Sequence, residues 1–213
     1  DTPNYPGIYD IARLSAGGAI AAAKHCLNSG EKAFSLMRPP GHHATGNQPG
    51  GFCYFNSIAI ACLKVQKQAG RIAIIDFDCH HGNGTEDIMM GRQDILYVSH
   101  HQSPLYPGTG LKTINNCLNF PLHSGITPQE FLDSFRQGMR KVTEFKPDML
   151  AISAGFDSYR LDPITNLSLE QETYREIGNI ISTLQKPAFA ILEGGYSSDL
   201  GECVHQFLLG LEE

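Results

Sequence analysis

The sequence predicts an α/β fold in which a mostly parallel β-sheet is flanked by helices. Short runs rich in Ile, Val, Leu and Ala alternate with longer stretches of helical periodicity, as in consecutive βαβ units. Polar, glycine-rich clusters follow the short runs. The 213 residues, 41% hydrophobic and 18% charged, suit one sizeable core without a linker. We therefore expect a single domain over residues 1–213.

Periodicity and glycines place the elements in chain order. A helix is expected over 9–27, ending before Gly30, and another over 56–68, ending before Gly70, because glycine favours the backbone that closes a helix. Continuous apolar runs are typical of strands that are buried on both faces. The expected strands are 33–37, 72–76, 95–99, 149–153 and 188–192, and the later helices are 128–144, 169–184 and 200–211.

The polar clusters all follow the carboxyl ends of predicted strands. In open α/β sheets that edge is where ligands bind, so five separate loops are expected to converge on one site. The five clusters are 38–43, 76–84, 99–110, 154–162 and 193–196.

Composition excludes several classes of protein. A net charge of −6 disfavours a surface that grips nucleic-acid phosphates and suits a cationic substrate better. The longest apolar runs are far shorter than the roughly 20 residues that cross a bilayer, and from the first residues we expect no signal peptide. The six cysteines form no CxxC pair, which favours buried thiols in a reducing compartment. We expect a cytoplasmic protein, or a nuclear one in a eukaryotic source.

A metal site is predicted where an apolar strand ends in Asp78-Cys79-His80. Asp78 and His80 are two apart, so in extended backbone their side chains point to the same side. Carboxylate and imidazole both suit Zn²⁺, and a catalytic zinc needs three protein ligands and an open position. Asp157, after another predicted strand, supplies a third. Each residue alone could be a loop cap or a structural histidine, and only the combination favours a metal.

Two further loops carry groups suited to amide hydrolysis. His42 and His43 follow a rigid Pro-Pro-Gly turn and titrate near neutral pH, as a general base and acid must. Asp76 is a candidate partner that would hold one imidazole charged. Tyr196, after Glu193-Gly-Gly, could donate a hydrogen bond to a developing oxyanion.

The motifs together resemble the histone deacetylase and acetylpolyamine amidohydrolase superfamily, in its class II-like or bacterial branch. The match spans nearly the whole chain in the order of the family. The motifs are RPPGHHA at 38–44, GGFCYFN at 50–56, DFDCHHGNGT at 76–85, YPGTG at 106–110, AGFDS at 154–158 and EGGY at 193–196.

The resemblance implies a three-layer, arginase-like fold with one zinc bound by Asp78, His80 and Asp157. It also implies a proton-handling His pair, with His43 as general base and acid, and Tyr196 as the group that polarises the carbonyl. The implied substrate-binding residues are Asp1 at the rim of a tunnel, Phe52 as one tunnel wall, Tyr106, Gly51 and Gly195. A structural potassium ion is implied around Asp76, Asp78, His80, Ser99 and His100.

Three departures from the family pattern bear on function. Asn83 stands where some members have an Asp behind the second His, which should leave His43 less cationic. Tyr106 stands where many members have Phe. The family's N-terminal portion has no counterpart in this sequence, which predicts an incomplete sheet edge and tunnel rim.

The expected activity is hydrolysis of an acetylated amine, foremost acetyl-lysine in proteins. Acetylated polyamines and small acetylated metabolites present a similar narrow chain and stay open as substrates. A non-catalytic acetyl-lysine binder is a second alternative. An arginase-type hydrolase with two manganese ions is a third, although Phe77 and Cys79 offer no bridging carboxylate.

Overall fold

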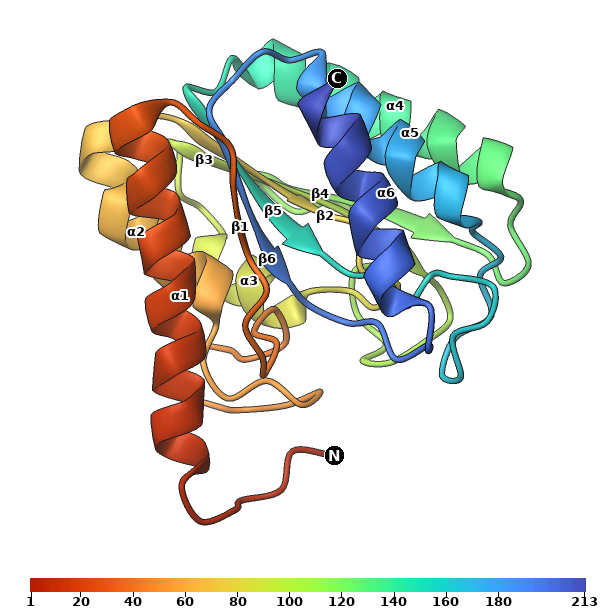
Figure 1. Cartoon of the computed structure of the whole chain (residues 1–213), viewed down its shortest axis with the longest axis horizontal. Coiled ribbons are helices and arrows are strands. Elements are labelled where there is room, and N and C mark those ends of the chain that lie inside the picture. The colour runs from red at the N-terminus through yellow and green to blue at the C-terminus, as the bar shows by residue number, and fades with distance from the viewer.

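The computed structural model describes all residues, 1–213, and contains a central six-stranded sheet between two layers of helices (Figure 1). Every strand pair is parallel, and the strand order is β1-β6-β5-β2-β3-β4. The strands are β1 (Ala33–Ser35), β2 (Ile72–Asp76), β3 (Ile95–Gln102), β4 (Cys117–Leu122), β5 (Met149–Ala154) and β6 (Ala188–Leu192).

The helices form one layer on each face of the sheet. One layer contains α1 (Ile8–Ser29), α2 (Ser57–Ala69) and the short α3 (Asn83–Met89), and the other contains α4 (Pro128–Phe145), α5 (Gln171–Ser182) and α6 (Leu200–Glu212). The predicted α/β fold with flanking helices is therefore confirmed, and its sheet is parallel throughout.

Two hydrophobic cores lie on opposite faces of the sheet. Along β2, Ile72 and Ile74 belong to the core under α1 and α2, whereas Ala73 and Ile75 belong to the core under the other three helices. This alternation follows from the period of two in a strand. Because both faces are covered, the central strands are continuous apolar runs, which is the pattern that made them recognisable.

The sequence reasoning missed two elements and misplaced some ends. β4 lies at the edge of the sheet and contains Asn119 and the exposed Pro121, so it lacks the apolar run of a central strand. The seven-residue α3 contains Gly84 and is too short to show a period. β3 continues to Gln102, three residues beyond its predicted end, because polar residues there are buried as well.

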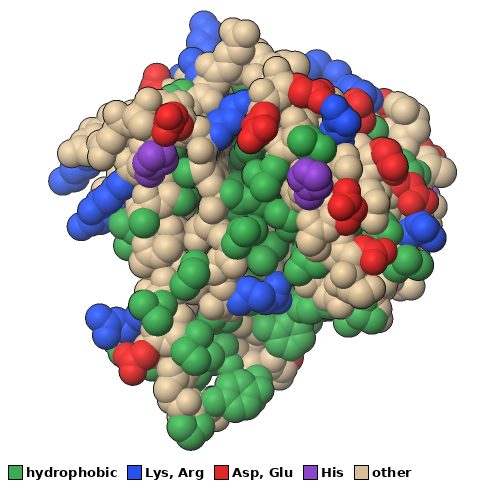
Figure 2. All heavy atoms as spheres, viewed as in Figure 1, with side chains coloured by type: hydrophobic (Ala, Val, Ile, Leu, Met, Phe, Trp, Pro, Cys, Tyr) green, Lys and Arg blue, Asp and Glu red, His purple; other side chains and the backbone are tan.

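The surface, the helices and the cysteines add three facts. Hydrophobic side chains gather near the N-terminal end of α1 (Figure 2), where Tyr5, Tyr9, Ile11 and Leu14 are exposed. None of the helices combines the length and the apolar character that a bilayer-crossing segment needs. All six cysteines are buried free thiols, as the absence of CxxC pairs suggested.

Candidate metal centre and active site

The three residues expected as metal ligands meet at the carboxyl edge of the sheet. Asp78 and His80 follow β2, and Asp157 follows the neighbouring β5. His80 Nδ1 lies 2.7 Å from Asp157 Oδ2 and 3.2 Å from Asp78 Oδ1. One possible ligand atom from each residue falls within 4.8 Å of the other two. Two loops that are 77 residues apart in sequence therefore present a ready-made O, O, N donor set.

The surroundings of this cluster fit a bound cation. Burial lowers the pKa of His80, but hydrogen bonds and charges from Asp157 and Asp78 raise it to about 10, so the cluster concentrates negative charge. Main-chain N–H groups orient both carboxylates: Gly194 donates to Asp78 Oδ2 at 2.7 Å, and Cys79 donates to Asp157 Oδ1 at 2.8 Å. A Cβ on Gly194 would lie 2.6 Å from Asp78 Oδ2, so only glycine fits beside the cluster.

His42 is buried between carboxylates. Its Nδ1 lies 3.1 Å from Asp76 Oδ2, and its Nε2 lies 3.7 Å from Asp78 Oδ1. Burial lowers the pKa of His42, but the charges of Asp78, Asp76 and Glu193 together raise it well above its usual range. Asp76, the partner considered from the sequence, is hydrogen-bonded to His42 and is one of the three carboxylates that favour its charged form. Tyr97 also donates to Asp76, at 2.9 Å.

His43 has the opposite electrostatic environment. Its Nδ1 bonds Asn83 Oδ1 at 2.8 Å, and its ring lies 4.1 Å from that of His42, measured between centroids. Burial, and then the positive charge of His42, lower the pKa of His43 well below its usual range. The neutral Asn83 cannot offset these effects as a carboxylate would. The adjacent imidazoles thus hold different protonation states, and His43 is the one able to accept a proton.

A pocket of about 270 Å³ opens directly above the candidate metal cluster of Asp78, His80 and Asp157. It is lined by side chains from the loops that follow β1, β2, β3, β5 and β6, so the predicted convergence of five loops is observed. The lining residues are Asp1, Pro40, His42, His43, Gly51, Phe52, Asp78, His80, Tyr106, Ile164, Gly194 and Tyr196.

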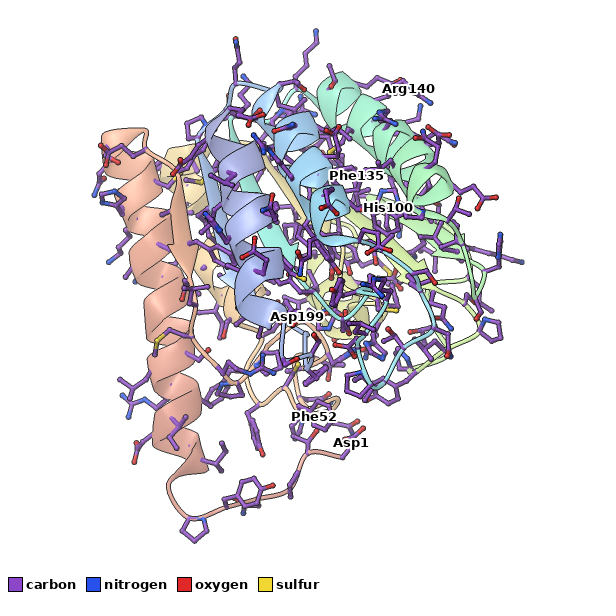
Figure 3. All side chains as sticks on the ribbon, turned by 45° about the vertical axis from the view of Figure 1, so that its right-hand side comes forward. Asp1, Phe52, His100, Phe135, Arg140 and Asp199 are labelled. Atoms are coloured by element: carbon purple, nitrogen blue, oxygen red, sulfur yellow. The ribbon has the colours of Figure 1, made fainter.

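Aromatic side chains form the mouth of this pocket. The Tyr106 ring stands edge-on to the His43 ring at 5.1 Å, and the Phe52 ring stands edge-on to the Tyr196 ring at 5.9 Å. Phe52 has a φ of +66°, which is unusual for a bulky residue and holds its ring at the rim. Asp1 also reaches the rim and lies near Phe52 (Figure 3).

The Phe52 turn is closely fitted to the His pair. Gly51 has a φ of +54°, and a Cβ there would lie 2.2 Å from His43 Cδ2. The Gly51 main chain therefore packs directly on the imidazole and limits its orientation.

Tyr196 approaches the pocket from the loop after β6. Its main-chain N–H donates to Asp162 Oδ2 at 2.8 Å, and the Arg38 guanidinium lies 5.4 Å from its ring centroid. Burial, followed by the charge of Asp78, raises the pKa of the Tyr196 phenol. The hydroxyl thus stays protonated and can serve as a hydrogen-bond donor.

Some predicted positions lie away from the pocket. Gly195 packs behind it, against Leu200 and Phe156, and Gly194 lines the wall instead. Ser99 Oγ bonds His101 Nδ1 at 2.9 Å. The His100 ring points into the core beside Phe135 (Figure 3), so His100 could contribute only its main-chain carbonyl to a potassium site.

Three lining residues were not selected from the sequence. Pro40 and Gly194 lie inside the quoted motifs but carry no reactive group. Ile164 stands in the irregular segment after β5, which contains several other apolar residues such as Leu161 and Leu167, so no signal in the sequence singled it out.

Comparison with known proteins identifies the family of this fold and site. The model of the histone deacetylase domain matches residues 1–211. The chain belongs to the histone deacetylase family. It is 41% identical to a probable deacetylase from Methanothermobacter thermautotrophicus, over all of this chain and 68% of that protein.

Two further relatives have more specific names. An acetylpolyamine amidohydrolase 2 from Pseudomonas aeruginosa is 34% identical, over 99% of this chain and 64% of its own length. The crystal structure of an acetylpolyamine aminohydrolase from Burkholderia pseudomallei has a TM-score of 0.89 at 35% identity, covering 92% of this chain and 60% of that one. The chain thus spans about two thirds or less of the length of these family members.

Proposed function

We propose that the protein is a zinc-dependent deacetylase that hydrolyses the amide of an N-acetylated amine. The observation that carries this proposal is the cluster of Asp78, His80 and Asp157 at the floor of a pocket that also presents His43 and Tyr196. Membership of the histone deacetylase family supports the same chemistry.

Zinc suits the cluster better than a pair of manganese ions. Two carboxylates and one imidazole would hold a zinc ion with three protein ligands and would leave a position for water or substrate. A two-metal site needs further bridging carboxylates, but Phe77 packs in the core and Cys79 contacts Gln102. When bound, the zinc would supply Lewis-acid activation of the carbonyl and of water.

The protein side chains would then divide the proton transfers. Neutral His43 accepts a proton from the attacking water and returns one to the departing amine nitrogen. Charged His42 stays bonded to Asp76 and favours the neutral form of its neighbour. Tyr196 donates a hydrogen bond to the acetyl oxygen as negative charge develops there.

Acetyl-lysine in a protein is the substrate that we propose first. Phe52 and Tyr106 at the mouth would flank its narrow aliphatic chain, and the Asp1 carboxylate at the rim would contact the peptide backbone. An acetylated polyamine is the alternative, because its second amine is cationic and Asp1 is acidic, and because two relatives carry that name. The potassium site also stays a proposal, around Asp76, Asp78, His80 and the main chain at Ser99 and His100.

The proposal is tested by hydrolysis of an acetyl-lysine peptide, N-acetylputrescine and N-acetylspermidine by the zinc-loaded chain. Asp157→Ala should lose bound zinc and turnover together. Asp133→Ala, on the exposed face of α4, is the matched control and should retain both. Unchanged turnover by Asp157→Ala, with metal content measured, would refute the ligand set. Preference for the polyamines would replace the acetyl-lysine reading by the alternative.

A further inference from the structure

Glu193 is a fully buried carboxylate that neither belongs to the metal cluster nor lines the pocket. It directly follows β6 and precedes the two glycines that lead to Tyr196. A buried carboxylate is costly unless its oxygens accept hydrogen bonds, so its partners indicate what it does.

All the partners of Glu193 belong to the loop that carries the His pair or to the adjacent strand. Oε2 accepts the main-chain N–H of Gly41 at 2.6 Å and that of His42 at 3.1 Å. Oε1 accepts the Ser153 hydroxyl at 3.0 Å. The main-chain carbonyl of Glu193 accepts from Arg38 Nη1 at 3.3 Å. Glu193 therefore contacts both ends of the turn from Arg38 to His42, and this turn determines where the imidazoles lie.

The chain that follows Glu193 contacts Asp78 directly and leads to Tyr196. The next residue, Gly194, donates its N–H to Asp78, and Tyr196 follows two residues later. A shift of the Glu193 main chain would therefore move the phenol and a metal ligand relative to the imidazoles. We propose that Glu193 is a positioning residue that sets the geometry of the His pair against the metal cluster and Tyr196.

The proposal rests on the proposed hydrolase function, and it makes a claim about shape rather than charge. A glutamine at 193 could turn its carbonyl oxygen toward the two N–H groups and donate its NH₂ to Ser153 Oγ. An aspartate would keep the negative charge, but its oxygens would withdraw by one methylene from both N–H donors. Positioning therefore predicts that glutamine substitutes for Glu193 and that aspartate does not.

The test compares Glu193→Gln, Glu193→Asp and Ser153→Ala, each loaded with zinc and assayed for zinc content, kcat and KM. Ser153→Ala is the matched control, because it removes the Oε1 partner and leaves the loop contacts. Glu193→Asp should lower kcat about 100-fold with KM within about threefold, since a misplacement near 1 Å has that effect on catalysis. Glu193→Gln should stay within about tenfold of the wild-type kcat, and Ser153→Ala within about threefold.

A second readout follows the imidazole directly. The ¹H and ¹⁵N resonances of His42 Nδ1–H, which faces Asp76, should move in Glu193→Asp and stay near the wild-type position in Glu193→Gln. Equal losses of kcat in both variants, a worse result for Gln than for Asp, or unmoved His42 resonances in Glu193→Asp would overturn the proposal. If the wild type hydrolyses no acetylated amine, the proposed function fails, whereas the His42 resonances still decide the positioning role.

Discussion

Replacing His100 by Leu should make the protein more resistant to acid. The His100 imidazole is fully buried on the α4 side of the sheet, stacked on Phe120 with 4.6 Å between centroids. Its Nδ1 lies 3.2 Å from Ser134 Oγ, and its Nε2 has no hydrogen-bond partner. Burial, and then the nearby His101, lower the pKa of His100 to about 3. The folded protein therefore keeps this ring neutral across most of the acidic range.

The sign of the effect follows from proton linkage. In the unfolded chain His100 titrates near its usual pKa of about 6.5, so between about pH 6.5 and pH 3 the unfolded state binds a proton that the folded state does not. Stability contributed by the neutral ring is present above pH 6.5 and is lost as the pH falls through this window. At about 1.36 kcal/mol per pH unit, the loss at pH 5 is about 2 kcal/mol.

A leucine side chain in place of His100 would carry no such penalty. Leucine can pack against the surrounding Phe120, Phe131 and Phe135 rings. It removes the buried Nε2 that has no hydrogen-bond partner, and it loses one hydrogen bond to half-buried Ser134. We expect the two proteins to differ by less than about 1 kcal/mol at pH 8. The difference in unfolding free energy between His100→Leu and the wild type should shift by about 2 kcal/mol in favour of the variant between pH 8 and pH 5.

Urea unfolding of both proteins at pH 8 and pH 5, under the same metal loading, measures this difference. The pH dependence of metal binding is common to both and cancels in the comparison. A stability difference between the two proteins that is the same at both pH values would refute the account of His100 as a buried neutral ring.

Three further changes probe the site. Asn83→Asp should raise the pKa of His43, so that the acidic limb of the pH profile of kcat/KM moves to higher pH; an unmoved limb would contradict His43 as the base. Gly51→Ala should destabilise the fold by roughly 1–3 kcal/mol and reduce turnover, because its Cβ meets His43; a thermal unfolding scan that matches wild type would exclude the clash. Tyr196→Phe should lower kcat roughly 100- to 1,000-fold with zinc retained, and turnover near wild type would remove the phenol from the mechanism.

Sequence reasoning succeeded where the geometry of a strand and the common edge of a parallel sheet determine the outcome. The spacing of Asp78 and His80 fixes their side of the strand, and the rule that parallel strands end at one edge brought Asp157 to them. The partners of the His pair were recognisable for a related reason, because Asp76 and Asn83 lie in the same strand-end motif as Asp78 and His80.

The features that escaped prediction depend on contacts between distant segments. Glu193 reads as part of a glycine-rich turn, and only the pairing of β1 with β6 brings it to the Gly41 main chain 152 residues away. His100 reads as a polar strand end, whereas the packing of α4 over β3 buries it among aromatic rings. Edge strand β4 was not predicted, because it is only partly buried and its sequence contains Asn119 and Pro121 in place of a continuous apolar run.

The arrangement of charge around β2 explains why two adjacent histidines can take different roles. Asp76 and Asp78 leave the same strand two residues apart, and His42 lies between them, 3.1 Å from one carboxylate and 3.7 Å from the other. Its positive charge is thereby balanced from both sides. Burial and that same imidazolium lower the pKa of His43, and its partner Asn83 is a neutral amide that does not offset them. Carboxylates around one ring, and burial beside that charged ring for the other, therefore leave His43 as the neutral imidazole of the pair, at the wall of the pocket.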